Sequence, residues 1–285
     1  MRVLVTNDDG FDAPGLACLA RALCEAGHDV IVVAPQSEAS GAGAGIGPVH
    51  LRQGGIRSEA VAPIGLEGIE AIAADALPAL IVITACLGAF GPIPDLIASG
   101  INPGRNVGRA VLHSGTVGAA LTSVHFGLKG LATSIQAGIV PSTYESADGS
   151  HIYFDSAAAL AVEFAAHLET APPRTVLNLN VPNLPLARIR GVRLARLANT
   201  GLNFMARVNE REPDPSHDGS SSRSGDESAP KDSDDALTEL GWAVVTPLTT
   251  VTEDRRPEIG NFVTAAVASA SDFIGSVRAT SLEGP

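Results

Sequence analysis

Residues 1–35, MRVLVTNDDGFDAPGLACLARALCEAGHDVIVVAP, contain the pattern that decides the fold. An apolar run at 2–6 predicts a short buried strand, and a second run at 29–34, stopped by Pro35, predicts another. Between them, Pro14 suits the first turn of a helix that runs to about Ala26 and ends at Gly27. Strand, helix and strand in so short a span indicate a right-handed parallel crossover. The chain is therefore expected to open as a doubly wound sheet.

The rest of the chain continues this alternation. Apolar and alternating segments predict further strands at 95–99, 130–135, 175–181 and 191–197. Longer apolar segments predict helices at 77–90, 115–126 and 258–278. The first of these helices contains a β-branched run, 81–84, that also suits a strand. The expected fold class is α/β, with a doubly wound, mainly parallel, Rossmann-like sheet, a C-terminal β extension and a C-terminal helix.

Composition limits the possible partners. The net charge is −12, from 31 acidic and 19 basic side chains, which argues against a surface for a nucleic acid duplex. Cys18, Cys24 and Cys86 form no CxxC pair, as is typical of a reduced protein. No apolar run approaches the ~18 residues of a membrane helix. We therefore expect a cytoplasmic protein that binds neither a membrane nor a nucleic acid duplex.

Two segments are expected to be loops. The stretch 41–47 has the spacing GxGxGxG, which does not match the dinucleotide fingerprint GxGxxG. The tract 209–236 contains nine acidic and three basic side chains and almost no hydrophobic ones. Such a tract buries too little apolar surface to offset its ordering entropy, so a mobile acidic loop is expected. An acidic regulatory segment is the alternative.

Asp8 and Asp9 follow the first predicted strand, at the edge where open α/β sheets bind ligands. Two adjacent carboxylates repel each other unless protons or a cation intervene. Hard cations such as Mg²⁺ or Mn²⁺ suit carboxylate oxygens. The alternative is that both are turn or capping residues before Pro14.

Two later segments carry polar groups to the same edge. Asn102 follows the strand predicted at 95–99, and its amide oxygen is a neutral hard ligand. The hydroxyls and N–H groups of Ser114, Gly115 and Thr116 open a predicted helix, where anions bind; simple helix capping is the alternative, and the two interpretations are compatible. Since the strands belong to one sheet, these groups are expected to converge into a metal and phosphate site.

These motifs together resemble the SurE family. The match is dense in 1–41 and 95–135 and patchy over about 1–270. It is carried by Asn7-Asp8-Asp9-Gly10, Ala13-Pro14-Gly15-Leu16, Ala34-Pro35, Ser40-Gly41, Ser99-Gly100-Ile101-Asn102, Asn106, Ser114-Gly115-Thr116-Val117, Asn178-Leu179-Asn180-Val181-Pro182, Gly241-Trp242 and Thr246-Pro247-Leu248.

The resemblance implies a nucleotidase that removes phosphate from nucleoside 5′- and 3′-monophosphates. It implies one divalent cation per subunit, Mg²⁺ or Mn²⁺, held by Asp8, Asp9, Ser40 and Asn102. It places the phosphate near Asn7, Gly41, Asn106, Ser114, Gly115 and Thr116.

The resemblance also implies a domain organisation and an assembly. The chain is expected to form a single α/β domain over 1–285, with its core at 1–197. A projecting segment at 198–260, which includes the acidic loop 209–236, would join subunits into a homodimer or homotetramer.

The chain departs from the family pattern at several positions. Arg109 stands where the family usually has an acidic residue, His113 where it has Tyr, and Thr122-Ser123 where it has Glu-Gly. The acidic tract 209–236 replaces an aromatic, glycine-rich hairpin. The metal ligands are retained, so the departures concern substrate range and oligomer geometry.

The expected mechanism is metal-assisted hydrolysis, in which the cation polarises a phosphate oxygen and orients water. Asp8 and Asp9 are the predicted catalytic residues; a role as general base or as a nucleophile that forms an aspartyl phosphate stays open. Two other functions stay open: a broad acid phosphatase or exopolyphosphatase, and a non-catalytic nucleotide-binding protein.

Overall fold

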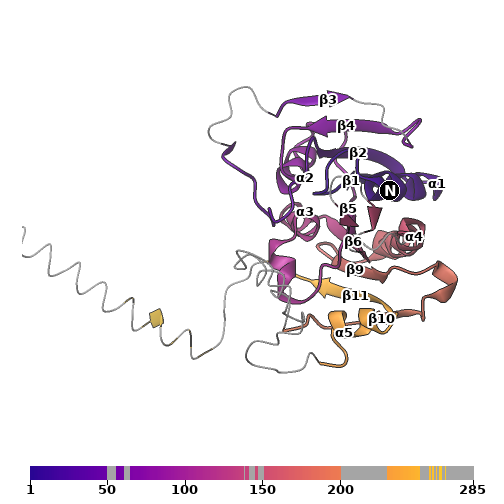
Figure 1. Cartoon of the computed structure of the whole chain (residues 1–285). Helices are drawn as coiled ribbons and strands as arrows, with labels where there is room; N and C mark the ends of the chain where they lie inside the picture. Colours follow the sequence, from indigo (N-terminus) through magenta and orange to yellow (C-terminus); the bar gives the residue numbers. More distant parts are fainter. Residues whose placement is uncertain are drawn as a thin grey trace, which may run out of the picture. The chain divides into compact units, whose positions relative to one another are not determined.

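The sheet is built outward from its first strand. In the computed structural model, β1 (Arg2–Thr6) pairs in parallel with β2 (Asp29–Pro35) on one side and with β5 (Leu96–Pro103) on the other (Figure 1). The chain passes first to the β2 side and then returns to the β5 side. The strand order therefore reverses beside β1, and such reversals are where ligands bind in α/β sheets.

The remaining strands extend the sheet in both directions. Beyond β2 lie β4 (Glu70–Ala74) and β3 (Ser58–Ala60). Beyond β5 lie, in spatial order, β6 (Lys129–Gln136), β9 (Val176–Pro182), β11 (Ala243–Leu248) and β10 (Val192–Leu194). Pairing is parallel from β4 to β9, whereas β3 and β11 run antiparallel to their inner neighbours. The expected doubly wound, mainly parallel sheet is confirmed.

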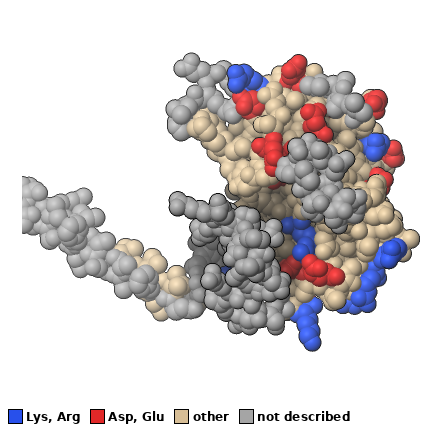
Figure 2. All heavy atoms as spheres, in the orientation of Figure 1, with Lys and Arg blue, Asp and Glu red and all other residues tan. Residues whose placement is uncertain are grey.

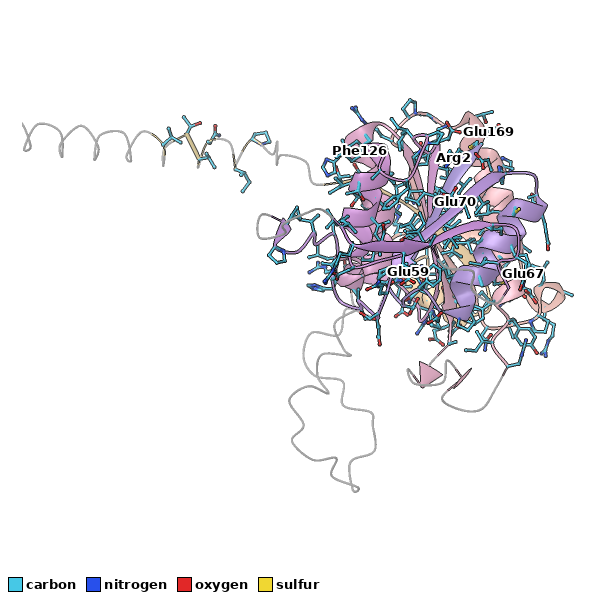
Figure 3. The ribbon with its side chains drawn as sticks, turned by 90° about the horizontal axis from the view of Figure 1, so that it is seen from above. Arg2, Glu59, Glu67, Glu70, Phe126 and Glu169 are labelled. Atoms are coloured by element: carbon cyan, nitrogen blue, oxygen red, sulfur yellow. The ribbon has the colours of Figure 1, made fainter. Side chains whose placement is uncertain are left out.

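Helices cover both faces of this sheet, as the view from above shows (Figure 3). Leu16 and Leu19 of α1 (Pro14–Glu25) and Ala161 of α4 (Phe154–Thr170) pack against one face. Ile81 of α2 (Pro78–Cys86) and Ala119 of α3 (Gly115–Thr122) pack against the other. Successive residues of β1 point to opposite faces, because strand side chains alternate. The central strand is thus buried on both sides.

Short helices and strands complete the described structure. The 3₁₀ turns are η2 (Gly108–His113), η3 (Ser123–Phe126) and η4 (Leu186–Arg188). A six-residue helix, α5 (Asp234–Glu239), packs beside β11, and β7 (Ile139–Val140) pairs with β8 (Glu145–Ser146) in a separate small sheet. No helix in the described residues is long and apolar enough to cross a membrane.

The structure describes residues 1–49, 56–60, 65–137, 139–140, 145–146, 151–199, 230–250 and single positions between 257 and 267. Residues 1–249 form one compact unit, and 250–285 form a second. The predicted helix 258–278 and the part of the acidic tract before 230 lie mostly or wholly outside the described residues.

The end of the acidic tract differs from the expected mobile loop. Ser233 accepts a hydrogen bond from the N–H of Ala236 and so caps α5, and Asp234 is fully buried. A further difference concerns β5, which continues to Pro103 instead of ending at Ser99, because Asn102 and Pro103 pair with β6 after a register shift.

Both signs of charge occur on the face drawn in Figure 2. Acidic side chains are spread over the upper part together with some basic ones, and further basic side chains lie at the lower right, where β10 lies in Figure 1.

Candidate metal and phosphate site

Asp8 and Asp9 lie directly after β1, at the point where the strand order reverses. Both are buried, with exposures of 3% and 6%. The turn that holds them is fixed by Asn7, whose Nδ2 donates to the carbonyl oxygen of Gly10 at 2.8 Å. The side chain of Asn7 is fully buried, so in this structure it shapes the turn.

The N-terminus of α3 points at the Asp8 carboxylate. Thr116 Oγ1 donates to Asp8 Oδ1 at 2.5 Å, and the N–H groups of Gly115 and Thr116 also interact with this carboxylate. A Cβ at Gly115 would lie 2.7 Å from Asp8 Oδ2, so only glycine permits this approach. Helix N-termini attract anions, and here the anion is Asp8 itself.

Burial disfavours the charged form of both carboxyl groups. It raises the pKa of Asp8, an effect that the Thr116 hydrogen bond and the backbone N–H groups oppose. Burial, together with the charges of Asp8 and Glu38, raises the pKa of Asp9 to about 8. Among the ion pairs of the described residues, none involves Asp8. A divalent cation would relieve the repulsion between two such neighbours.

Ser40 and Gly41 lie on a loop that is bonded to the same turn. The N–H of Ala39 donates to the carbonyl oxygen of Asp8 at 2.7 Å, and Ser40 Oγ donates to Glu38 Oε1 at 2.8 Å. With its proton directed to Glu38, Ser40 can offer its oxygen lone pairs to a cation. Gly41 has φ +79°, a conformation that glycine adopts without strain.

Asn102 reaches this edge from the neighbouring strand. Thr6 of β1 pairs in register with Ser99 of β5, and Asn102 lies three residues further on. Its Nδ2 donates to the carbonyl oxygen of Gly104 at 2.7 Å, so its Oδ1 is the atom that would bind a cation. The structure thus places Asn102 and Asp8 at adjacent strand ends.

Asn106 is held by a network of hydrogen bonds to two amide side chains of β9 and a hydroxyl of β6. Its carbonyl oxygen accepts from Nδ2 of Asn178 and of Asn180, at 2.8 and 2.9 Å. Its N–H donates to Asn180 Oδ1 at 2.8 Å, and its own Nδ2 donates to Ser134 Oγ at 2.9 Å. These bonds fix the loop between β5 and η2, which the resemblance places near the phosphate.

The signal for this network was present in the sequence. Asn178 and Asn180 are two residues apart in a strand, so both point to one face of the sheet. As a sequence motif these two residues indicate the family, but not their contact with Asn106.

The capping interpretation of Ser114 is confirmed, since its Oγ accepts from the N–H of Val117 at 3.1 Å.

The residues that depart from the family pattern fit into the fold. Arg109 and His113 are exposed, and the buried hydroxyls of Thr122 and Ser123 donate to carbonyl oxygens of α3 itself. None of these four residues disturbs the turn that carries Asp8 and Asp9.

The chemistry of the predicted ligands fits a hard cation. Two carboxylates, a hydroxyl and an amide offer only oxygen atoms, which suit Mg²⁺ or Mn²⁺. No group of three His, Cys, Asp or Glu side chains that could hold a metal occurs in the described part of the chain. A ligand set of this kind is compatible with that result, because Ser40 and Asn102 supply half of it.

Comparison with known proteins identifies the family. The family model described as Survival protein SurE matches residues 3–203. The protein named 5′-nucleotidase SurE from Xanthomonas campestris pv. campestris (strain B100) is 40% identical over 202 residues, and the alignment covers 70% of each chain. The protein of the same name from Stenotrophomonas maltophilia (strain K279a) is 38% identical over 203 residues, with the same coverage.

The fold comparison agrees. The crystal structure of the SurE protein from Aquifex aeolicus is similar, with a TM-score of 0.67 and 23% identity, over 93% of this chain and 100% of that one. With the matching sequence motifs and the geometry at Asp8 and Asp9, these comparisons establish that the chain belongs to the SurE family.

Proposed function

We propose that this protein is a metal-dependent phosphomonoesterase that hydrolyses nucleoside 5′-monophosphates, and also 3′-monophosphates, to nucleoside and phosphate. The observation that carries the proposal is the buried Asp8-Asp9 pair at the reversal of strand order, with the N-terminus of α3 directed at it. The names of its relatives from Xanthomonas and Stenotrophomonas support the same activity.

We assign a separate role to each group of residues in the site. Asp8, Asp9, Ser40 and Asn102 would hold the cation. When bound, the cation supplies Lewis-acid polarisation of a phosphate oxygen and lowers the pKa of water. Thr116 and Gly115 fix the orientation of Asp8, and Asn106 lies on a rigid loop suited to receive the phosphate. Fixed ligands of this kind favour catalysis because they need little reorganisation.

The metal and the assembly are also proposals. The oxygen ligands favour Mg²⁺ or Mn²⁺ over softer metals that prefer thiolate ligands. A homodimer or homotetramer is proposed from the family resemblance, and light scattering on the purified protein measures it directly.

The activity is tested by phosphate release from a panel of substrates with and without metal. Wild type should release phosphate from AMP or GMP with Mn²⁺ or Mg²⁺, and EDTA should abolish release. Asp8→Asn and Asp9→Asn should each lose at least about a hundredfold in kcat/KM, because each removes a charged ligand. Asp12→Asn is the matched control, since Asp12 lies in the same turn but is exposed.

The same panel separates the alternatives. Turnover of sugar phosphates or short polyphosphate in preference to AMP would identify a broader phosphatase. Nucleotide binding with metal but without phosphate release would identify a binding protein. Full activity of Asp8→Asn would contradict the assignment of the site.

A further inference from the structure

The loop that carries Asn106 is held from a second side, by α5. The N–H of Gly108 donates to Asp234 Oδ2 at 2.8 Å. The other carboxylate oxygen, Oδ1, accepts from the N–H groups of Ala198 and Asp235, each at 2.9 Å. A single side chain therefore joins the start of η2, directly after the loop that carries Asn106, to the segment after β10 and the first turn of α5.

Asp234 is an unusual residue for an acidic tract. Its side chain is fully buried, whereas a solvated loop would expose it. Burying a carboxylate is costly unless hydrogen bonds satisfy it, and here three backbone N–H groups do so. Burial raises the pKa of Asp234, and the N–H groups of Gly108, Ala198 and Asp235 oppose this rise.

A pair of salt bridges supports the same contact. Arg105 Nη1 lies 2.9 Å from Asp235 Oδ1 and 2.7 Å from Glu239 Oε1. Arg105 directly precedes Asn106, and its side chain is only 24% exposed. The residues on both sides of Asn106 are thus attached to α5.

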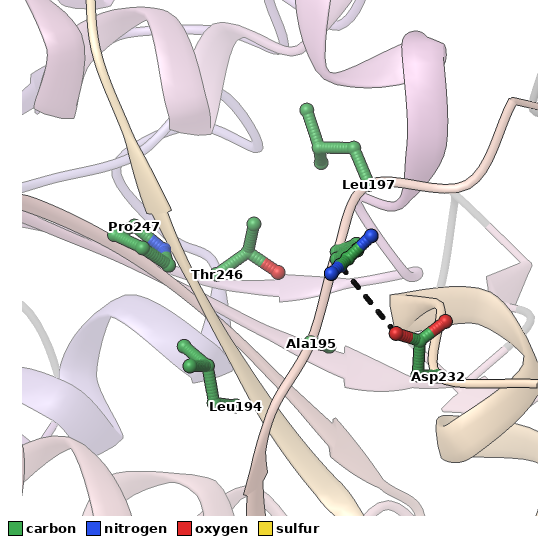
Figure 4. A pocket seen from close by; sticks show the side chains of 7 residues that line it. Leu194, Ala195, Leu197, Asp232, Thr246 and Pro247 are labelled. Atoms are coloured by element: carbon green, nitrogen blue, oxygen red, sulfur yellow. Dashed lines mark ion pairs between the residues drawn. The ribbon is translucent and has the colours of Figure 1, made fainter.

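The neighbouring Asp232 provides a contrast. It lies at a pocket of about 590 Å³ lined by Leu194, Ala195, Leu197, Thr246 and Pro247 (Figure 4). There it pairs with Arg196 at 3.5 Å, and both side chains are largely exposed. Asp232 belongs to the same acidic tract as Asp234, but among the described residues its side chain pairs with Arg196 and not with the loop that carries Asn106.

We infer that Asp234 is a positioning residue of the phosphate site: its buried carboxylate holds Gly108, and through Gly108 it fixes the loop from which Asn106 meets the phosphate. This inference rests on the proposed function. It also gives α5 a role in the active site, although α5 lies within the segment that the family resemblance assigns to subunit assembly. A loop that is anchored on both sides binds a ligand at a lower ordering cost.

The test compares Asp234→Asn with Asp232→Asn in the full chain. Asparagine has the size of aspartate but loses the charge and one acceptor, so an amide group would face a backbone N–H. We expect the KM for AMP and the inhibition constant of inorganic phosphate to rise about tenfold, as for the loss of a charged hydrogen bond. The turnover number and the Mn²⁺ affinity, measured by calorimetry, should stay within about twofold of wild type. Asp232→Asn should change neither the KM for AMP nor the inhibition constant of phosphate.

A merely structural role would give a different result. Asp234→Asn would then lower the melting temperature and the fraction of active protein, and therefore the apparent kcat. The KM and the phosphate inhibition constant would stay unchanged, and that outcome overturns the inference. If Asp234→Asn does not fold, Arg105→Gln removes the other attachment of the loop to α5, the ion pairs with Asp235 and Glu239, and should raise the same two constants. A wild-type protein that releases no phosphate would instead contradict the proposed function, and phosphate binding measured by calorimetry would still test the role of Asp234.

Discussion

Two buried threonines differ in what their hydroxyl groups do. Thr116 and Thr133 are both fully buried, but Thr116 donates to the Asp8 carboxylate whereas the Thr133 hydroxyl has no hydrogen-bond partner in the described part of the chain. We expect Thr116→Val to lower the free energy of unfolding by about 1.5–3 kcal/mol, because it removes a hydrogen bond to a charged group. Thr133→Val should be neutral or stabilising. Urea unfolding in EDTA measures both, and equal effects would contradict the assigned role of Thr116.

The cysteines also differ in their surroundings. The pKa of Cys18 is raised to about 12, mainly by burial and also by the hydrogen bond that its thiol donates to Asp155. Burial raises the pKa of Cys86 to about 11. A raised pKa keeps the thiol protonated at pH 8, and the thiolate is the reactive form. Iodoacetamide at pH 8 should therefore label the exposed Cys24 alone in the folded protein. Mass spectrometry would show three labelled sites after unfolding; labelling of Cys18 under native conditions would contradict the structure.

At the scale of elements, α3 packs closely against the end of the loop that carries Ser40 and Gly41. The N–H of Gly43 donates to the carbonyl oxygen of His113 at 3.1 Å, and a Cβ at Gly118 would overlap the carbonyl oxygen of Gly43. Gly118→Ala favours the helix by about 1 kcal/mol, whereas overpacking against backbone costs about 1–3 kcal/mol. We expect the clash to prevail, with a lower melting temperature and a weaker Mn²⁺ response as the loop is displaced. An unchanged Mn²⁺ affinity would show that this loop does not bear on the metal.

Elements could be predicted where the local pattern was sufficient. The strands at 2–6 and 29–34 and the helix that begins at Pro14 depend on apolar runs, prolines and a terminal glycine, and the structure contains all three. By contrast, β5 extends through Gly100 to Pro103 because β6 pairs with it, and α5 forms within an acidic tract because it packs beside β11. Both depend on neighbours distant in sequence, which a local pattern does not contain.

In the candidate site, too, local sequence patterns predict some features, whereas others depend on contacts distant in sequence. The placement of Asp8, Asp9 and Asn102 at one edge of the sheet could be predicted, since each follows an apolar run and the carboxyl ends of parallel strands share one edge. Their role as metal ligands stays a prediction. The contact between Asp8 and Thr116 joins residues 108 positions apart, and that between Gly108 and Asp234 joins residues 126 apart. Such contacts arise from the packing of α3 and α5, so only the folded chain reveals which residues hold the site rigid.

At the scale of the whole molecule, the buried carboxylate pair should make folding depend on the metal. A cation that binds only the folded chain stabilises it by about 2.7 kcal/mol at a hundred times its Kd. We therefore expect Mn²⁺ to raise the melting temperature of wild type by several degrees above its value in EDTA. Folding raises the pKa of Asp9 to about 8, which costs stability at neutral pH, and Asp9→Asn removes this cost. In EDTA this variant should therefore be at least as stable as wild type, yet it should lose the rise with Mn²⁺. Asp12→Asn should keep the rise. Calorimetric scans of the three proteins measure these effects, and a melting temperature of wild type that is the same in Mn²⁺ and in EDTA would contradict the metal site at the end of β1.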